Sequence, residues 1–319
     1  MKILATLSLI CLCLNGCKSQ EKKEISMETQ QRIKYIENNI KKFDYEPLYQ
    51  IKVKTNNCYQ ILINDFPVYS YYDELSGKIG FNINSAILKS GEQDLEIRIF
   101  PSYIEGDLQN EYLSSKDYFT LEIQQTAWDK QGSLEKPKVI FSYERPEKDS
   151  LGEYVNYNNL KYYKEKFTFN ANVPYELTGW SESEDLTKVE GVKDKALNFY
   201  KKVIESFNRK DYDLFNTLYL KADNEWYQSE YFPLTTIEKY QNSLYKNNFE
   251  GLSIYKLENF RVSFYCNNRI IALESLSGKN RGNSSFAYEY INNSGMKVAE
   301  WNNLFLHIPK GKTELEIIR

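Results

Sequence analysis

The stretch YQIKVKTNNCYQILI, residues 49–63, contains the pattern that decides the fold. Apolar and polar side chains alternate on either side of the turn-forming Thr55-Asn56-Asn57. Successive side chains of a β-strand point to opposite faces of the sheet, so a period of two indicates a strand with one buried face. Residues 49–63 therefore predict two half-buried strands joined by a short turn.

The same alternation continues from Tyr49 to about Val173 in seven runs. Turn-forming stretches separate the runs, and no helical pattern lies between them, which predicts antiparallel sheets packed as a β-sandwich over residues 46–180. The architecture resembles immunoglobulin-like sandwiches, although the chain lacks their Cys-Trp-Cys pattern. The alternating apolar residues are Ile51 and Val53; Ile61 and Ile63; Ile79, Phe81 and Ile83; Leu95, Ile97 and Ile99; Phe119, Leu121 and Ile123; Val139, Phe141 and Tyr143; and Phe167, Phe169 and Ala171.

Residues 144–159 are rich in Glu, Asp, Asn and Gly and predict a long exposed loop. Inside it, Asp149-Ser150-Leu151 resembles the short acceptor motif for O-linked glycans on envelope proteins of some bacteria. The resemblance implies a glycan attached to Ser150. An unmodified, solvated loop is the alternative interpretation.

The acidic run SESEDLTKVE, residues 181–190, indicates a linker over residues 181–191, followed by an α+β domain over residues 192–319. A first amphipathic helix is expected to end at Asn208, a second to begin with Asp211 as its N-cap, and a third to open at Thr235. Alternating apolar residues after Gly251 predict an antiparallel sheet that continues to the C-terminus.

Residues 199–219, FYKKVIESFNRKDYDLFNTLY, look like the two short opening helices of the NTF2-like family. That resemblance implies a curved sheet wrapped around helices to form a conical pocket. Four aromatic residues and the only histidine are candidates to line such a pocket. They are Trp226, Tyr227, Tyr290, Trp301 and His307.

At the N-terminus, a short apolar run after Lys2 ends in Leu14-Asn15-Gly16-Cys17, after which the polar sequence KSQEKKE begins. The run is too short to cross a membrane as a helix, which needs about 20 residues. It resembles a bacterial lipoprotein signal peptide, with Asn15 where the family usually has Ser, Ala or Thr. The resemblance implies removal of residues 1–16 and acylation of Cys17.

Several acyl chains on one residue anchor a protein durably to a membrane. Residues 17–45 would then form a lipidated tether with a short amphipathic helix, whose apolar stripe contains Ile33, Ile36, Ile40 and Phe43. We expect this helix to pack on the domain that follows it; a partner-binding or membrane-lying helix is the alternative. Lys18 is not the aspartate that marks inner-membrane retention in some bacteria, which favours the outer membrane.

The composition excludes several function classes. One histidine rules out multi-histidine metal sites, and no nucleophile, phosphate-loop, dinucleotide or calcium motif occurs, so we expect neither a metal nor a cofactor. His307 in a strand-like run indicates a hydrogen-bonded structural histidine, with a general base as the alternative. Cys58 and Cys266 are expected to be buried free thiols. A sequence pI near 5.6 disfavours nucleic-acid binding.

The sequence therefore predicts a lipid-anchored protein of the cell envelope that acts as a non-enzymatic binding or structural module. Its expected partner is an envelope protein or glycan. Two other functions remain open: an immunity or inhibitor lipoprotein against a toxin or lytic enzyme, and an enzyme with a pocket in the C-terminal domain. Exposed Trp and Tyr side chains are typical of binding surfaces, which is why the aromatic residues are the first candidates.

Overall fold

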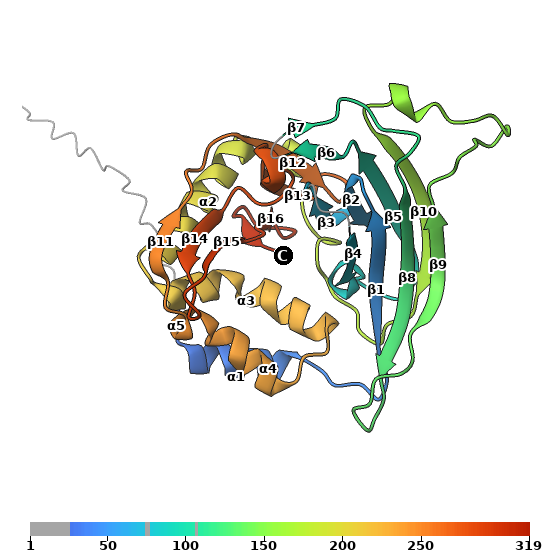
Figure 1. Ribbon diagram of the computed structural model, residues 1–319. Helices are drawn as coiled ribbons and strands as arrows, with labels where there is room; N and C mark the ends of the chain where they lie inside the picture. Colours follow the sequence, from blue (N-terminus) through green and yellow to red (C-terminus); the bar gives the residue numbers. More distant parts are fainter. Residues whose placement is uncertain (1–25, 74–76, 106–107) are drawn as a thin grey trace, which may run out of the picture.

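The computed structural model describes residues 26–73, 77–105 and 108–319 (Figure 1). The predicted signal peptide, Cys17 and the first part of the tether lie outside the described residues. Within the described part of the chain, no helix is both long enough and apolar enough to span a membrane.

The described elements are five α-helices and seventeen strands, with four short 3₁₀ turns. The helices are α1 (Thr29–Asn39), α2 (Val192–Asn208), α3 (Tyr212–Ser229), α4 (Leu234–Gln241) and α5 (Ser243–Lys246). The strands of the N-terminal part are β1 (Glu46–Thr55), β2 (Cys58–Ile63), β3 (Phe66–Tyr71), β4 (Gly77–Asn82), β5 (Gly91–Phe100), β6 (Tyr103–Glu105), β7 (Leu108–Gln109), β8 (Phe119–Trp128), β9 (Lys138–Glu144) and β10 (Tyr163–Ala171). Those of the C-terminal part are β11 (Glu250–Ile254), β12 (Phe260–Tyr265), β13 (Ile270–Ser275), β14 (Ala287–Ile291), β15 (Lys297–Trp301), β16 (Phe305–His307) and β17 (Glu316–Ile317).

The N-terminal part contains two four-stranded antiparallel sheets, ordered β4-β1-β8-β9 and β10-β5-β2-β3. Each of the seven predicted alternating runs forms a strand. In the first sheet Ile51 lies opposite Ile123 and Val53 opposite Leu121, and all four side chains are buried. They belong to one apolar core together with Ile61, Ile97 and other residues of the second sheet. The prediction of antiparallel β-structure is confirmed.

Strand β2 departs from the expected half-burial, because all six of its residues are buried. One side of its sheet faces β1 and β8, and the other side is covered by the C-terminal part. Tyr265, Ala272 and Phe305 from that part belong to the same apolar core as Ile61. The ring of Phe66 stacks on Trp180 at 5.0 Å and meets Phe305 at 4.8 Å between ring centroids. The core is therefore continuous between the two parts.

The C-terminal part has a three-stranded sheet, β11-β14-β15, and a four-stranded sheet, β12-β13-β16-β17, with α2 and α3 packed against them (Figure 1). Helix α2 ends at Asn208 as expected, and Asp211 caps α3 by accepting a hydrogen bond from the Leu214 backbone N–H at 3.1 Å. The expected start of the third helix at Thr235 is wrong. Helix α4 begins at Leu234, and Pro233 occupies its N-cap position.

The interior of the C-terminal part is filled with aromatic rings. Phe207 of α2 is fully buried, and its ring contacts five others. The distances between ring centroids are 6.2 Å to Tyr212, 5.4 Å to Phe215 and Phe249, 5.7 Å to Phe286 and 4.7 Å to Tyr288. These closely packed side chains fill the space between the helices and the sheets.

The segment predicted as an acidic linker, residues 181–191, is hydrogen-bonded to the C-terminal part. The backbone N–H of Glu184 donates to the Ile308 carbonyl, and that of Leu186 donates to the Asn268 carbonyl, each at 2.9 Å. Leu186 itself is fully buried. Among the acids of this segment, Glu182 and Glu190 are exposed and Glu184 and Asp185 are half-buried. A segment with a fixed backbone can therefore have the composition of a linker.

Helix α1 packs against α3 and α4, and not on the sandwich that directly follows it in sequence. Ile36 is fully buried there in a small core with Leu220 and Ile237. The helix is also fixed by Arg32, whose side chain is entirely buried. The stripe was therefore predicted correctly at Ile33 and Ile36, but α1 ends at Asn39, so Ile40 and Phe43 lie beyond the helix. The expected packing partner was also wrong.

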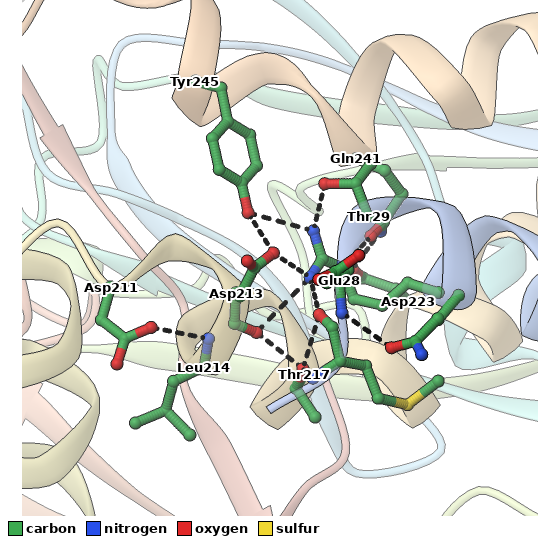
Figure 2. Close-up of polar contacts among 12 residues, drawn as sticks. Glu28, Thr29, Asp211, Asp213, Leu214, Thr217, Asp223, Gln241 and Tyr245 are labelled. Atoms are coloured by element: carbon green, nitrogen blue, oxygen red, sulfur yellow. Dashed lines mark hydrogen bonds and ion pairs between the residues drawn. The ribbon is translucent and has the colours of Figure 1, made fainter. Parts of the chain in front are cut away.

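The Arg32 guanidinium donates hydrogen bonds to four side chains: Asp213 at 2.8 Å, Gln241 at 3.0 Å, Thr29 at 2.8 Å and Tyr245 at 3.3 Å. It also donates to the Met27 carbonyl. Figure 2 shows these partners converging from α1, α3, α4 and α5. A buried guanidinium needs such partners because an unpaired charge away from water is costly.

Candidate functional site

A cleft of about 630 Å³ lies at the junction of the two parts, next to the segment that follows α1. Residues 40–48 form one side, residues 128–132 after β8 form another, and residues 227–236 around the end of α3 close the third. This volume is within the range of clefts that hold small ligands or side chains of a partner, about 300–1,000 Å³. The cleft is our candidate site.

Glu230, the C-cap residue of α3, is the most deeply buried acid in this cleft, at 6 % exposed. Its Oε2 accepts a hydrogen bond from Asn82 Nδ2 of β4 at 2.8 Å. Within the described residues, its Oε1 accepts no hydrogen bond, and no cation forms an ion pair with the carboxylate. Burial raises the pKa of Glu230 to about 7, and the hydrogen bond from Asn82 opposes the rise.

The end of α3 positions Glu230 through a Schellman motif. The backbone N–H of Phe232 donates to the Tyr227 carbonyl, and that of Tyr231 donates to the Gln228 carbonyl. The motif requires a left-handed residue after the C-cap, usually glycine, and here Tyr231 adopts it with φ of 55°. A bulky residue in this conformation is strained, and such strain is concentrated at functional sites.

The sandwich fixes the end of the same helix. Asn84 Nδ2 donates to the carbonyls of Ser229 at 3.1 Å and Pro47 at 2.9 Å. On the other side, Gln228 exchanges two hydrogen bonds with the backbone of Lys41, at 2.6 and 2.9 Å. The walls of the cleft are therefore joined to one another by buried polar contacts.

A second carboxylate, Glu46, and an exposed indole, Trp128, line the cleft from the sandwich. The two residues lie directly opposite each other in the β1–β8 ladder, so their side chains share a face of the sheet. Burial raises the pKa of Glu46, while the Phe43 backbone N–H and nearby Lys42 oppose the rise. Trp128 is 37 % exposed.

Aromatic rings form the apolar surface of the cleft. Phe43 meets Tyr231 edge to face at 6.3 Å between centroids, and Phe232 continues the surface. The hydroxyl of Tyr231 is buried and has no hydrogen-bond partner among the described residues. Lys41, Lys42 and Lys130 stand exposed at the rim, where Lys130 pairs with Asp44 at 2.7 Å.

The structure separates the five residues predicted to line a conical pocket. Tyr227 is buried, accepts a hydrogen bond from Gln241 at 3.1 Å, and contributes to the cleft. Trp226 packs on Phe232 at 5.2 Å. Tyr290 lies in the C-terminal core and donates to Glu300 at 3.0 Å. Trp301 of β15 is 43 % exposed beside a small hollow of about 100 Å³.

His307 is buried in β16, and its Nδ1 lies 2.7 Å from Ser183 Oγ. Burial lowers the pKa of His307 to about 4, against the nearby carboxylates of Glu316 and Glu225. The imidazole is therefore neutral at physiological pH and hydrogen-bonded inside the fold. It does not line the cleft.

The remaining candidate residues have no role in the cleft. Ser150 lies exposed in the loop that follows β9, where Asp149 accepts hydrogen bonds from the backbone of Leu151 and Glu153. Cys58 and Cys266 are buried and free, as expected. Burial raises the pKa of Cys58 to about 12, so its reactive thiolate form is scarce at neutral pH. The described residues contain no group of three or more potential metal ligands.

No protein-family model, no curated protein and no solved structure matches this chain.

Proposed function

We propose that this protein is a lipid-anchored component of a bacterial cell envelope that binds a partner protein in the cleft beside Glu230. The observation that carries the proposal is the composition of the cleft: exposed and half-buried aromatic rings around a buried, incompletely hydrogen-bonded carboxylate. Aromatic residues dominate the binding energy of protein interfaces because they bury a large area at a low cost in conformational entropy.

The proposed anchor rests on Leu14-Asn15-Gly16-Cys17. Replacing Cys17 with serine is expected to move the protein from the membrane fraction to the soluble fraction, because serine has no thiol to receive the lipid. Fractionation after a salt wash, together with labelling by radioactive palmitate, measures this. Cys13→Ser, which changes a thiol inside the signal peptide, is the matched control and should leave the protein on membranes. Continued sedimentation of the Cys17→Ser protein would contradict the anchor.

The cleft itself can be tested in cells with a photo-cross-linking amino acid placed at position 128 of the full chain. We expect one discrete protein adduct from this position. The same amino acid at position 301 is the control, since Trp301 is exposed to a similar degree but lies outside the cleft. Adducts of equal yield from both positions, or an adduct to a glycan from position 128, would contradict the proposal.

Once the adduct has identified the partner, Trp128→Ala should weaken its binding by about tenfold or more, as expected for an aromatic anchor of an interface. Trp301→Ala should leave the affinity unchanged. Surface plasmon resonance with the purified partner measures both values. Equal affinities of the two variants for the partner would show that Trp128 does not contribute to binding and that this cleft is not the binding surface.

A further inference from the structure

We propose that the cleft accepts the side chain of a lysine from the partner, with the ammonium group on Glu230 and the aliphatic stem against the aromatic walls. This inference rests on the proposed function and specifies the chemistry that the site recognises. It is carried by three features of the cleft, which are the unpaired carboxylate, the end of α3 and the ring of aromatic side chains.

The carboxylate of Glu230 has an unfilled position. Glu274, which is buried to a similar degree, forms an ion pair with Arg261 at 2.9 Å and accepts a hydrogen bond from Ser263. By contrast, Glu230 has only the neutral Asn82 amide as a hydrogen-bond donor within the described chain. Glu230 lines the cleft, and its Oε1 accepts no hydrogen bond from the described residues. An ammonium group supplies both the missing charge and the missing donors.

The end of α3 favours a cation at the same place. The helix runs for 18 residues from Tyr212 to Ser229, and the negative end of its dipole lies at the C-cap residue, Glu230. This end repels a second negative charge and attracts a positive one. No described basic side chain of α3's own last turn occupies the position.

The aromatic walls suit the rest of a lysine side chain. Its four-carbon stem is apolar and packs along rings, while its charged end reaches a polar partner. Phe43, Tyr231 and Phe232 supply such a surface, and Trp128 presents its indole at the opening. A cation near aromatic faces gains a further attraction from their electron-rich surfaces.

The charges around the cleft differ in depth. Lys41, Lys42 and Lys130 are exposed at the rim, where water and salt screen them. Glu230 is buried, so its interaction with a bound ammonium is screened much less. The rim lysines therefore reduce the attraction of a second cation without cancelling it.

The pH dependence follows from the ionisation of Glu230. The titratable groups that face it are Tyr231 next in sequence, Tyr175 from the segment after β10, and Glu46 from β1 across Tyr231. Both tyrosines have pKa values raised by burial and stay neutral at physiological pH. The pKa of Glu230 is raised to about 7. Lysine binding should therefore be strong above this pH and weaken as the pH falls through it, because the carboxyl group becomes neutral.

The experiment uses the full chain in detergent, labelled with 5-fluorotryptophan and followed by ¹⁹F NMR. The Trp128 resonance reports occupancy of the cleft, and the Trp301 resonance is the reference. The probe is Nα-acetyl-lysine amide, and the matched controls are its Nε-acetylated form and Nα-acetyl-norleucine amide, which lack the charge. At about pH 8 we expect the lysine probe to bind about tenfold or more tightly than either control, as for a charge-assisted hydrogen bond.

The matched variants are Glu230→Gln and Glu46→Gln. Glu230→Gln should weaken the lysine probe by about tenfold or more and abolish the loss of affinity between about pH 8 and pH 5.5. Glu46→Gln should retain most of the affinity. A midpoint of thermal unfolding equal to that of the wild type at low pH verifies that each variant is folded.

Three results would overturn the inference: no shift of the Trp128 resonance with the lysine probe, equal binding of its acetylated form, or a loss that follows Glu46→Gln instead of Glu230→Gln. None of these would affect a cross-link to a partner protein from position 128. Failure of that cross-link, in turn, would reject the proposed function independently of the lysine probe.

Discussion

Replacing Arg32 with methionine is expected to lower the free energy of unfolding by about 3 kcal/mol, the magnitude found when one partner of a buried charged network is removed. The side chain of Arg32 is fully buried and donates hydrogen bonds to groups on α1, α3, α4 and α5. Methionine fills much of the same space but donates no hydrogen bond. The buried amide oxygen of Gln241 would be left without its donor, and Asp213 would lose its ion pair.

One nearby acid aggravates this loss. Burial raises the pKa of Asp223 to about 7, while the Gln241 amide and the charge of Arg32 oppose the rise. Without Arg32, the pKa of Asp223 rises further, so the folded state holds an added proton near neutral pH. Since the folded state then binds protons more tightly than the unfolded state, the variant should lose additional stability as the pH increases through neutrality.

Urea unfolding at several pH values measures the effect. The matched control is Lys34→Ala, which removes a cation from the exposed side of the same helix and should change stability by less than about 0.5 kcal/mol. Limited proteolysis should also cut α1 of the Arg32→Met protein faster than that of the wild type. Equal stability of the Arg32→Met and Lys34→Ala proteins would show that the network does not hold α1.

Phe66→Ala is expected to lower the free energy of unfolding by about 3–5 kcal/mol, as for other buried Phe-to-Ala changes. Phe66 is 5 % exposed and stands where the two parts of the chain meet. Its ring is almost parallel to that of Trp180, at 12° between planes, and also contacts Phe305 of β16. Its removal leaves a cavity lined by residues from both parts.

The position of Phe66 determines what the unfolding curve should look like. If the continuous core makes the parts unfold together, the variant should unfold in one transition at lower temperature by every probe. Calorimetry and tryptophan fluorescence give the comparison, with the change of exposed Leu151 to alanine as the control. Two transitions, only one of which moves in the variant, would instead support separate domains with a boundary near residues 181–191.

The strands of the sandwich could be predicted because alternation is a local property. Each run from Ile51 to Ala171 shows in its own sequence which face is buried. For strand β2, the sequence predicted the burial of only one face. The residues that bury its second face, such as Tyr265 and Ala272, lie about 200 positions away in the chain. The packing partner of α1 was missed for the same reason, since an isolated apolar stripe does not identify the surface that it meets.

The candidate site was mostly beyond the reach of the sequence. Glu230 is one of 44 acidic residues, and Asn82, which bonds it, is 148 positions away. The local spacing of residues therefore cannot predict the contact between Glu230 and Asn82. The aromatic candidates were selected by residue type, and Tyr227 alone of those in the predicted pocket borders the cleft. The sequence did contain one local signal. Pro233 indicates that a helix ends shortly before it, and the cleft lies at this helix end.

The docking of α1 fixes how far the cleft can stand from a membrane. If Cys17 carries the lipid, as proposed, the chain between it and Glu28 can span at most about 40 Å even when fully extended. From Arg32 onward the chain is held to the body of the protein, and residues 40–43 already form a wall of the cleft. The segment between the proposed lipid and α1 would therefore be a short tether that leads directly to the binding site. A partner that reaches the cleft must itself approach to within about one protein diameter of the bilayer surface.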